Sequence, residues 1–292
     1  PKEDGSPDMS YYEQAAKEVA AAIEGYTVLV TKSTVPVGTG KWLKEFVAAN
    51  LKTETDFGLA SNPEFLREGA AIQDFMRPDR VVIGSNEPKA IAVMKDLYRP
   101  LYLIETPIVI TSLEAAELIK YAANAFLATK ITFINEIANL CDAIGCDVHD
   151  VARGMGMDNR IGRKFLHPGP GYGGSCFPKD TRALTTVADK FNVETRIVDA
   201  VIDANDRQRD AMIPKIEKLV GDLNGKRIGV LGLSFKPETD DMRESPAIDI
   251  VHSLIEKGAT VSAFDPVAMD EAKHFINGIE YAEDEYEAIS GA

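Results

Sequence analysis

A glycine-rich stretch that leads into a cysteine is the feature of this sequence best suited to chemistry. Residues 169–179 read GPGYGGSCFPK, and such closely spaced glycines allow backbone N–H groups to approach a ligand. Cys176 lies near the end of this stretch, just ahead of a helix that Pro178 can start. A thiol near a helix N-terminus and beside Lys179 is expected to form thiolate readily. This favours a nucleophile over a structural cysteine in a tight turn.

Two polar residues on an apolar helical stripe are further candidates. Lys120 and Asn124 lie one helical turn apart, on a stripe that continues to Leu127 and Ile131. A polar group on such a stripe is costly unless another polar group meets it, so a functional role for the two residues is one interpretation. A lysine that extends to the surface is the alternative, and helical spacing alone does not decide between the two.

Carboxylates and hydroxyls also follow two predicted strands. Asn62-Pro63 predicts the start of a helix whose first turns would hold Glu64 and Glu68. Residues 32–38 (KSTVPVG) follow the preceding strand. Open α/β sheets bind ligands beyond the carboxyl ends of their strands, which favours a functional role. For the two carboxylates, an interaction with the helix dipole is the alternative.

A weaker signal lies in the C-terminal part of the chain. Residues 229–236 (GVLGLSFK) follow a predicted strand and resemble a nucleotide-binding turn, but they lack the spacing G-x-G-x-x-G. Lys236 and Arg243 supply positive charge for a phosphate, although either fits a solvated surface equally well. A true dinucleotide fingerprint, which would follow a strand, is not found, and no metal site is predicted.

Helix and strand patterns alternate from residue 10 to about residue 111, which predicts a parallel sheet covered by helices. Helices are expected over residues 11–23, 41–50 and 88–98, and strands over 26–31, 57–60, 80–84 and 108–111. A capping box at residues 111–114 (TSLE) then opens a helical pattern that reaches Gly145 without glycine or proline. A helix of this length is expected to join two lobes or to pack against a second copy.

Another helical pattern runs from about residue 194 to 223, with Pro214 as the expected place of a kink or break. At residue 226 the alternation restarts, with a strand over 227–233, a helix over 245–258 and a strand over 260–264. The predicted fold class is α/β, with two Rossmann-like parallel-sheet lobes joined by the long central helix and a helical domain. The N-terminal lobe is expected to be incomplete. The predicted domains are residues 1–111, 112–223 and 224–292.

Composition and charge exclude several classes of protein. The 292 residues carry a net charge of −14 and 45% are hydrophobic. The acidic excess argues against nucleic acid or an anionic membrane as partner, and no membrane span or signal peptide is recognisable. Three cysteines are too few for a disulfide framework, so a cytoplasmic location is expected, with Cys141 and Cys146 buried and structural. The loop-like start at Pro1 and the end at Ala292 lead us to expect a longer parent, cut at both ends.

Five motifs together resemble the nucleotide-sugar dehydrogenases, that is, the UDP-glucose/GDP-mannose dehydrogenase family. They are KSTVPVG at 32–38, SNPEFLREG at 61–69, ELIKYAANAFLATK at 117–130, GPGYGGSCFPKDT at 169–181 and GLSFKPETDDMRESP at 232–246. The resemblance covers nearly the whole chain. It implies an NAD-binding Rossmann domain, a long central helix used in dimerisation and a C-terminal domain that holds UDP.

The resemblance also implies a reaction. NAD would accept hydride twice as the primary alcohol of UDP-glucose is oxidised to the carboxylate of UDP-glucuronate. Cys176 would form a thiohemiacetal and then a thioester, which prevents escape of the reactive aldehyde. Lys120, helped by Asn124, would stabilise the oxyanion charge.

The remaining roles also follow from the resemblance. Asp180 with an ordered water would handle protons, Glu64 would assist thioester hydrolysis, and Thr34 would lie near the water. Substrate contacts are expected from Glu64, Phe65, Leu66, Arg67, Glu68, Lys120, Asn124, Arg160, Phe165, Leu166, His167, Pro168, Gly169, Tyr172, Gly173, Phe235 and Lys236. NAD contacts are expected from Ser33, Thr34, Val35, Glu68, Lys179 and Arg243. The protein would be a homodimer or a higher homo-oligomer, with Arg160 reaching the substrate of a neighbouring subunit.

The sequence departs from the family at its ends. The family begins with a strand and a G-x-G-x-x-G turn that hold the pyrophosphate, and this chain starts after them. Two alternatives stay open. In the first, the same chemistry would act on another nucleotide sugar, such as GDP-mannose or UDP-N-acetylmannosamine. In the second, the chain would be a non-catalytic fragment that binds a nucleotide sugar.

Overall fold

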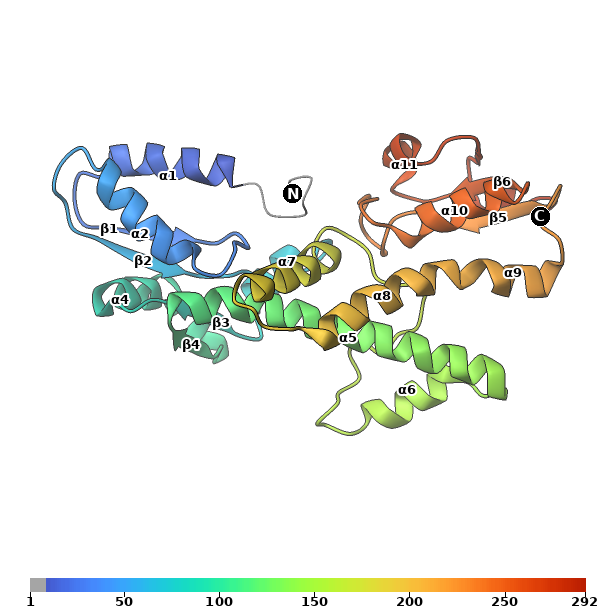
Figure 1. Cartoon of the computed structure of the whole chain (residues 1–292), viewed down its shortest axis with the longest axis horizontal. Helices are drawn as coiled ribbons and strands as arrows, with labels where there is room; N and C mark the ends of the chain where they lie inside the picture. Colours follow the sequence, from blue (N-terminus) through green and yellow to red (C-terminus); the bar gives the residue numbers. More distant parts are fainter. Residues whose placement is uncertain (1–8) are drawn as a thin grey trace. The chain divides into compact units, whose positions relative to one another are not determined.

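The computed structural model describes residues 9–292 and shows an α/β protein with two compact units (Figure 1). The first unit comprises the described residues up to Ala123 together with Thr186–Val193, and the second comprises Asn124–Thr185 with Glu194–Ala292. The α/β class predicted from the sequence is confirmed. The expectation of a chain cut at Pro1 concerns a segment outside the described residues.

A four-stranded sheet in the order β1-β2-β3-β4 forms the centre of the first unit. Its strands are β1 (Thr27–Thr31), β2 (Phe57–Ser61), β3 (Val81–Gly84) and β4 (Ile108–Thr111). β1 pairs with β2 in parallel and β3 with β4 in parallel, as predicted. β2 and β3 run antiparallel and pair at Ser61 and Gly84, so this sheet is not parallel throughout. Parallel neighbours need a crossover, usually a packed helix, whereas between β2 and β3 only α3 (Ala71–Met76) forms, and it buries no residue.

Helices cover both faces of this sheet (Figure 1). They are α1 (Ser10–Ala22) and α2 (Thr39–Asn50) on one face and α4 (Pro88–Leu97) on the other, followed by the short 3-10 helix η1 (Arg99–Ile104). Side chains of a strand alternate between the two faces. Leu29 of β1 accordingly packs with Val47 of α2, whereas its neighbour Val28 packs with Met94 of α4. The sheet is therefore the middle layer of three.

No helix begins at Asn62-Pro63, so the prediction for this segment is wrong. Asn62 does not cap a helix, because its Nδ2 donates across the sheet to the carbonyl of Val82 at 2.7 Å. The backbone N–H of Leu66 donates to Oε2 of Glu64 at 2.5 Å, which holds the segment in a turn. Glu64 and Glu68 consequently lie on an irregular loop rather than in a first helical turn.

The long helix is confirmed as α5 (Leu113–Ile144), 32 residues without interruption. Ser112, rather than Thr111, caps its start, because the Ser112 hydroxyl accepts from the N–H of Ala115 at 3.2 Å. At the other end Gly145 has a φ of +78° and donates to the carbonyl of Cys141 at 2.8 Å, a common way for a helix to end. None of the helices in the described part of the chain, α5 included, has the length and apolar character needed to cross a membrane.

Four further helices follow α5, namely α6 (Val148–Gly156), α7 (Phe177–Lys190), α8 (Arg196–Asp210) and α9 (Met212–Val220). The 194–223 pattern is broken at Ala211, between α8 and α9, and not at Pro214 as predicted. Pro214 then falls in the first turn of α9, where a backbone N–H has no partner within the helix and its absence costs little.

The C-terminal lobe of the second unit has a parallel sheet in the order β5-β6-β7. Its elements are β5 (Arg227–Leu231), α10 (Pro246–Glu256), β6 (Thr260–Phe264), α11 (Met269–Phe275), β7 (Glu280–Tyr281) and α12 (Glu285–Ile289). The strand predicted over 260–264 is confirmed residue for residue. A core centred on Leu233, Leu254 and Val261 joins the sheet to α9, α10 and α11.

Candidate functional site

Cys176 lies immediately before α7 and is exposed. The carbonyl of Cys176 accepts the N–H of Asp180 at 2.8 Å, so the cysteine forms the first turn of the helix, and Pro178 occupies an early position where its missing N–H is not needed. The predicted placement of this thiol at a helix N-terminus is confirmed. Ser175 Oγ lies 3.5 Å from the sulfur.

Asp180 is the centre of a polar cluster one turn further along α7. This residue is fully buried, and its side chain is 1% exposed. Asn124 of α5 donates from Nδ2 to Oδ2 of Asp180 at 2.6 Å, and Lys179 pairs with the other carboxylate oxygen. A buried carboxylate needs such partners, so the amide and the ammonium stabilise its charge. The structure thus brings together Asn124, Lys179 and Asp180, directly behind the turn that begins at Cys176.

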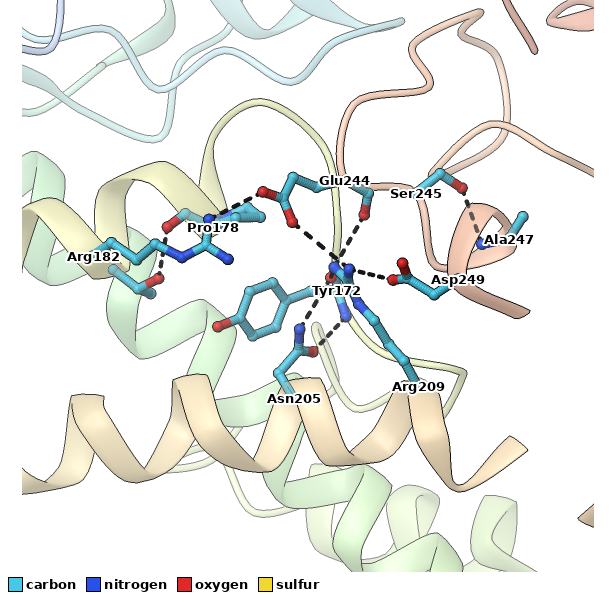
Figure 2. A network of polar contacts seen from close by, with 10 residues as sticks. Tyr172, Pro178, Arg182, Asn205, Arg209, Glu244, Ser245, Ala247 and Asp249 are labelled. Atoms are coloured by element: carbon cyan, nitrogen blue, oxygen red, sulfur yellow. Dashed lines mark hydrogen bonds and ion pairs between the residues drawn. The ribbon is translucent and has the colours of Figure 1, made fainter. Parts of the chain in front are cut away.

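The glycine-rich loop that leads to Cys176 is held by side chains that bond to its backbone. Asn205 of α8 accepts from the N–H of Tyr172 at 2.7 Å and donates to the carbonyl of the same residue at 3.2 Å (Figure 2). Gly169 is held similarly, because Asn135 accepts from its N–H at 2.8 Å and Gln208 donates to its carbonyl at 2.9 Å. Side chains of α5 and α8 therefore hold the loop at Gly169 and at Tyr172.

Arg209 of α8 extends this set of contacts to the C-terminal lobe (Figure 2). Its Nη2 donates to the carbonyl of Tyr172 at 2.9 Å and to the carbonyl of Glu244 at 3.1 Å, while Nη1 donates to Asp249 at 2.7 Å. Arg182 of α7 donates to the Glu244 carboxylate at 3.0 Å. Burial acts to lower the pKa of Arg182, but the Glu244 carboxylate raises it above the usual value overall.

The loop after β5 also approaches the glycine-rich loop. A Cβ on Gly174 would lie 2.5 Å from the ring of Phe235, so only glycine allows this contact, and φ of Gly174 is +81°. Lys236 lies over the Phe235 ring, with Nζ 5.3 Å from its centroid. Arg243 holds Asp241 through two hydrogen bonds of 2.8 Å.

Asp265 fixes the start of that loop. It follows β6, and its carboxylate accepts four backbone N–H groups at 2.7 to 3.1 Å, from Leu233, Ser234, Val267 and Ala268. Burial acts to raise the pKa of Asp265, but these four donors lower it below the usual value overall. The ionised carboxylate therefore organises the backbone that leads into Phe235 and Lys236.

In the first unit, Lys120 and Glu64 form an ion pair, with Nζ and Oε1 separated by 3.1 Å. Lys120 is only 4% exposed, so the polar partner that the sequence required for it is present. Its Nζ also lies 5.5 Å from the centroid of the Phe65 ring, and the guanidinium of Arg80 stacks on the same ring at 3.6 Å. Lys120 and Asn124 occupy successive turns of α5.

The loop after β1 is held by a buried carboxylate. Glu117 of α5 accepts from the N–H of Gly38 at 2.6 Å and of Gly40 at 2.7 Å, which places its charge at the N-terminus of α2. Burial raises the pKa of Glu117, and the two N–H groups act in the opposite direction. Val35 is buried, Thr34 is half-buried and Ser33 is exposed.

Several predicted contact residues are engaged elsewhere. Arg67 forms a fork with Asp74, with N–O distances of 2.7 and 2.9 Å, and exposed Arg160 forms one with Asp158. The other predicted residues of this part differ in burial: Leu66, Glu68, Phe165, Pro168 and Gly169 are partly buried, Leu166, Tyr172 and Gly173 are buried, and His167 is exposed. The ring of Phe165 packs edge-on against that of Phe177, with centroids 6.2 Å apart.

The two remaining cysteines differ. Cys141 is buried, as predicted, and its contact with Cys146 and its burial raise the pKa of its thiol to about 11. Cys146 is exposed, so the prediction of a buried residue is wrong for it. The reason is that α5 ends at Ile144, so Cys146 lies in the segment that follows the helix.

Sequence reasoning missed Glu117, Asn135, Asn205, Gln208 and Arg209. Glu117 and Asn135 carry the same signal as Lys120, since each is a polar residue on a mostly apolar helical face. Asn205, Gln208 and Arg209 are spaced i, i+3, i+4 and so share one face of α8. That spacing could have identified them as a set, although not the backbone that they hold.

Comparison with known proteins assigns the chain to a family of enzymes. Models of the UDP-glucose/GDP-mannose dehydrogenase family match over residues 1–102 (NAD binding domain), 114–207 (central domain) and 229–292 (UDP binding domain). The UDP-glucose 6-dehydrogenase of Rhizobium meliloti (strain 1021) is 53% identical, over 99% of this chain and 67% of that protein. UDP-glucose 6-dehydrogenase TuaD of Bacillus subtilis (strain 168) is 49% identical, over 98% of this chain and 61% of that protein. The chain thus spans roughly two thirds of the length of the curated relatives that it matches.

A solved structure shows the same relationship in three dimensions. The UDP-glucose dehydrogenase of the hyperthermophilic archaeon Pyrobaculum islandicum is 40% identical and superposes with a TM-score of 0.93, covering 99% of this chain and 67% of that one. The sequence identity to these relatives and the three domain matches, in the same order along the chain, agree on one family. The chain belongs to the UDP-glucose/GDP-mannose dehydrogenase family.

Proposed function

We propose that the protein is an NAD-dependent dehydrogenase that oxidises UDP-glucose to UDP-glucuronate in two hydride transfers. The observation that carries the proposal is the exposed Cys176 at the start of α7, with the buried Asp180 cluster one turn behind it. Two relatives whose names state UDP-glucose 6-dehydrogenase activity support the choice of substrate.

Cys176 is the proposed nucleophile. After the first hydride transfer oxidises the alcohol to an aldehyde, the thiol adds to the carbonyl carbon and gives a thiohemiacetal. A second hydride leaves the same carbon to give a thioester, and water then displaces the sulfur and releases the carboxylate. The exposure of Cys176 leaves its sulfur open to a sugar carbon, and the residue lies at the N-terminus of α7.

Charged residues are proposed to stabilise the oxygen atoms of these reaction intermediates and to move protons. Lys120, supported by Asn124, offsets the negative charge on the substrate oxygen, and Asp180 with a water moves protons. Glu64, the partner of Lys120, assists the attack of water on the thioester, and Thr34 lies near that water. The ion pair of Lys120 with Glu64 supports a pairing of these two roles, because each charge orients the other.

NAD supplies the hydride acceptor when it is bound. We propose Ser33, Thr34, Val35 and Glu68 as its contacts, since the two hydroxyls lie at the carboxyl end of β1, where open α/β sheets bind ligands. Lys179 and Arg243 are proposed as further contacts. Each holds a carboxylate, that of Asp180 or Asp241, so each cation already has a fixed orientation.

The UDP-sugar is proposed to contact three loops. These loops carry Glu64, Phe65, Leu66, Arg67 and Glu68; Phe165, Leu166, His167, Pro168, Gly169, Tyr172 and Gly173; and Phe235 with Lys236. We also propose the division into residues 1–111 for NAD, 112–223 for the helical part with the nucleophile, and 224–292 for UDP. The three domain matches support this division.

A homodimer is proposed from α5. Phe126, Phe133 and Leu140 are spaced by seven residues along this helix and all three are exposed. An exposed apolar stripe at this spacing is typical of a helix that packs against another copy. Arg160 would then reach the substrate of the second subunit. A cytoplasmic location is proposed because the three cysteines are free, which is typical of a reducing compartment.

A count of NADH tests the proposed function. Purified protein is incubated with excess NAD+ and limiting UDP-glucose, and the final NADH is measured by absorbance, with GDP-mannose and UDP-N-acetylmannosamine in parallel. We expect about two NADH per UDP-glucose, as the four-electron reaction requires, and much less with the other sugars. Two NADH from another sugar would favour the alternative substrate. Saturable UDP-glucose binding without NADH would favour a non-catalytic binding protein.

A further inference from the structure

Arg209 holds two loops at once, and none of the roles proposed above uses it. Its side chain is only 10% exposed, so its hydrogen bonds have little competition from water. Three bonds of 2.7 to 3.1 Å join its guanidinium to the carbonyls of Tyr172 and Glu244 and to the carboxylate of Asp249 (Figure 2). The guanidinium is thus the common partner of the loop before Cys176 and of the loop that leads into α10.

The two loops meet at a very short distance. The N–H of Gly174 donates to the carbonyl of Arg243 at 2.9 Å, and a Cβ on Gly173 would lie only 2.2 Å from the carbonyl oxygen of Glu244. Glu244 itself has a φ of +52°, which a side chain rarely adopts unless its surroundings enforce it. The contact therefore depends on groups that hold Glu244 in place, and Arg209 binds its carbonyl directly.

We propose that Arg209 is a positioning residue for the oxidation proposed above. Its guanidinium locks the loop that carries Cys176 against residues 241–249, which form the loop before α10 and the first turn of that helix, so that the thiol keeps one position relative to the residues proposed to hold the nucleotide. The inference rests on the proposed function for its catalytic consequence. Arginine suits this task because its planar fork stays charged and can donate to several acceptors at once.

Lysine cannot replace Arg209 in this role. An ammonium retains the charge but has a single nitrogen, whereas Nη2 of Arg209 donates to the two carbonyls and Nη1 donates to Asp249, so lysine cannot reach the carbonyls and the carboxylate together. Arg207 offers a matched control on the same helix, because its side chain is 71% exposed and pairs with Asp203 one turn earlier. Arg207 and Arg209 are thus the same residue type two positions apart on α8, and they differ in exposure and in their contacts.

The test compares Arg209→Lys, Arg209→Ala and Arg207→Ala in the purified protein. Steady-state kinetics measure kcat and KM for UDP-glucose, and hydrogen exchange with mass spectrometry follows the peptides that cover residues 170–176 and 241–248. For Arg209→Lys we expect kcat to fall about tenfold or more, with a smaller change in KM, since placement of the thiol matters most in the transition state. We expect exchange about tenfold faster in those two peptides only.

Separate outcomes overturn the separate claims. Wild-type kcat and wild-type exchange in Arg209→Lys would refute the positioning role. Faster exchange throughout the second unit, with a matching loss of thermal stability, would also refute it, because the residue would then support the whole unit. If the wild-type protein forms no NADH, the proposed function fails, but the exchange of the two loops still decides whether Arg209 holds them. Should Arg209→Ala not fold, the lysine variant decides alone.

Discussion

Replacing Asp265 by asparagine is expected to destabilise the C-terminal lobe strongly. One carboxylate accepts four backbone N–H groups at 2.7 to 3.1 Å, two on each oxygen. In Asp265→Asn one of these oxygens becomes an NH2 group, which faces two donors and accepts from neither. Leaving a buried donor unsatisfied costs about 1–3 kcal/mol, so two donors predict a loss of about 2–6 kcal/mol.

The lowered pKa of Asp265 also predicts how the loss of stability depends on pH. The four donors lower its pKa below the usual value despite its burial, so the carboxylate stabilises the folded state. That stability is fully present above the ordinary aspartate pKa of about 3.9 and is lost as the pH falls through the lowered folded-state pKa. The difference in stability between wild type and Asp265→Asn should therefore be large at pH 7 and should shrink in acid below pH 4 or so.

Hydrogen exchange of β5 and β6 measures this free energy within the lobe itself, over a range of pH. The control is Asp270→Asn, the same change in the same lobe, because Asp270 is 99% exposed and its ion pair, with Lys273 at 2.9 Å, lies on its own helix. We expect the control to lie within about 0.5 kcal/mol of wild type. The reasoning is refuted if Asp265→Asn lies equally close to wild type at pH 7, or if the difference grows in acid.

Two further substitutions test the first unit. Glu117→Gln loses one of the two acceptors for the N–H groups of Gly38 and Gly40, so the loop after β1 should loosen. In steady-state kinetics we therefore expect the KM for NAD+ to rise more than the KM for UDP-glucose. Equal changes in the two KM values would contradict the proposed role of this loop in NAD binding. Lys120→Ala removes a buried ammonium, and we expect kcat to fall about a hundredfold or more while UDP-glucose binding, measured by calorimetry, changes far less. Unchanged turnover would exclude oxyanion stabilisation by Lys120.

Elements with strong local signals were predictable from the sequence. The strand over 260–264 and the helix that ends before Gly145 follow from apolar periodicity and from a helix-ending glycine, and both are confirmed. The segment after Asn62 was not predictable in this way. Asn62-Pro63 is a local signal for the start of a helix, but the Asn62 amide instead donates across the sheet to the carbonyl of Val82. The antiparallel pairing of β2 with β3 likewise depends on tertiary contacts.

In the candidate site, too, local features were predictable from the sequence and tertiary contacts were not. The position of Cys176 ahead of α7 follows from residues next to it in the chain, whereas the partner of Lys120 lies 56 residues away at Glu64. Arg207 and Arg209 look alike in the sequence, yet one is exposed and the other joins two loops. Two of the three acceptors of Arg209 are backbone carbonyls, which residue types do not reveal, and the third, Asp249, lies 40 residues away in the sequence.

The covalent role of Cys176 is tested most directly by Cys176→Ser, with Cys146→Ser as the control because Cys146 is the other exposed cysteine. Products from UDP-glucose and NAD+ are separated by chromatography and identified by mass. We predict that Cys176→Ser retains the first oxidation or binding of the aldehyde while formation of UDP-glucuronate collapses, and that Cys146→Ser forms the acid at the wild-type rate. Formation of UDP-glucuronate by Cys176→Ser at the wild-type rate would contradict the account.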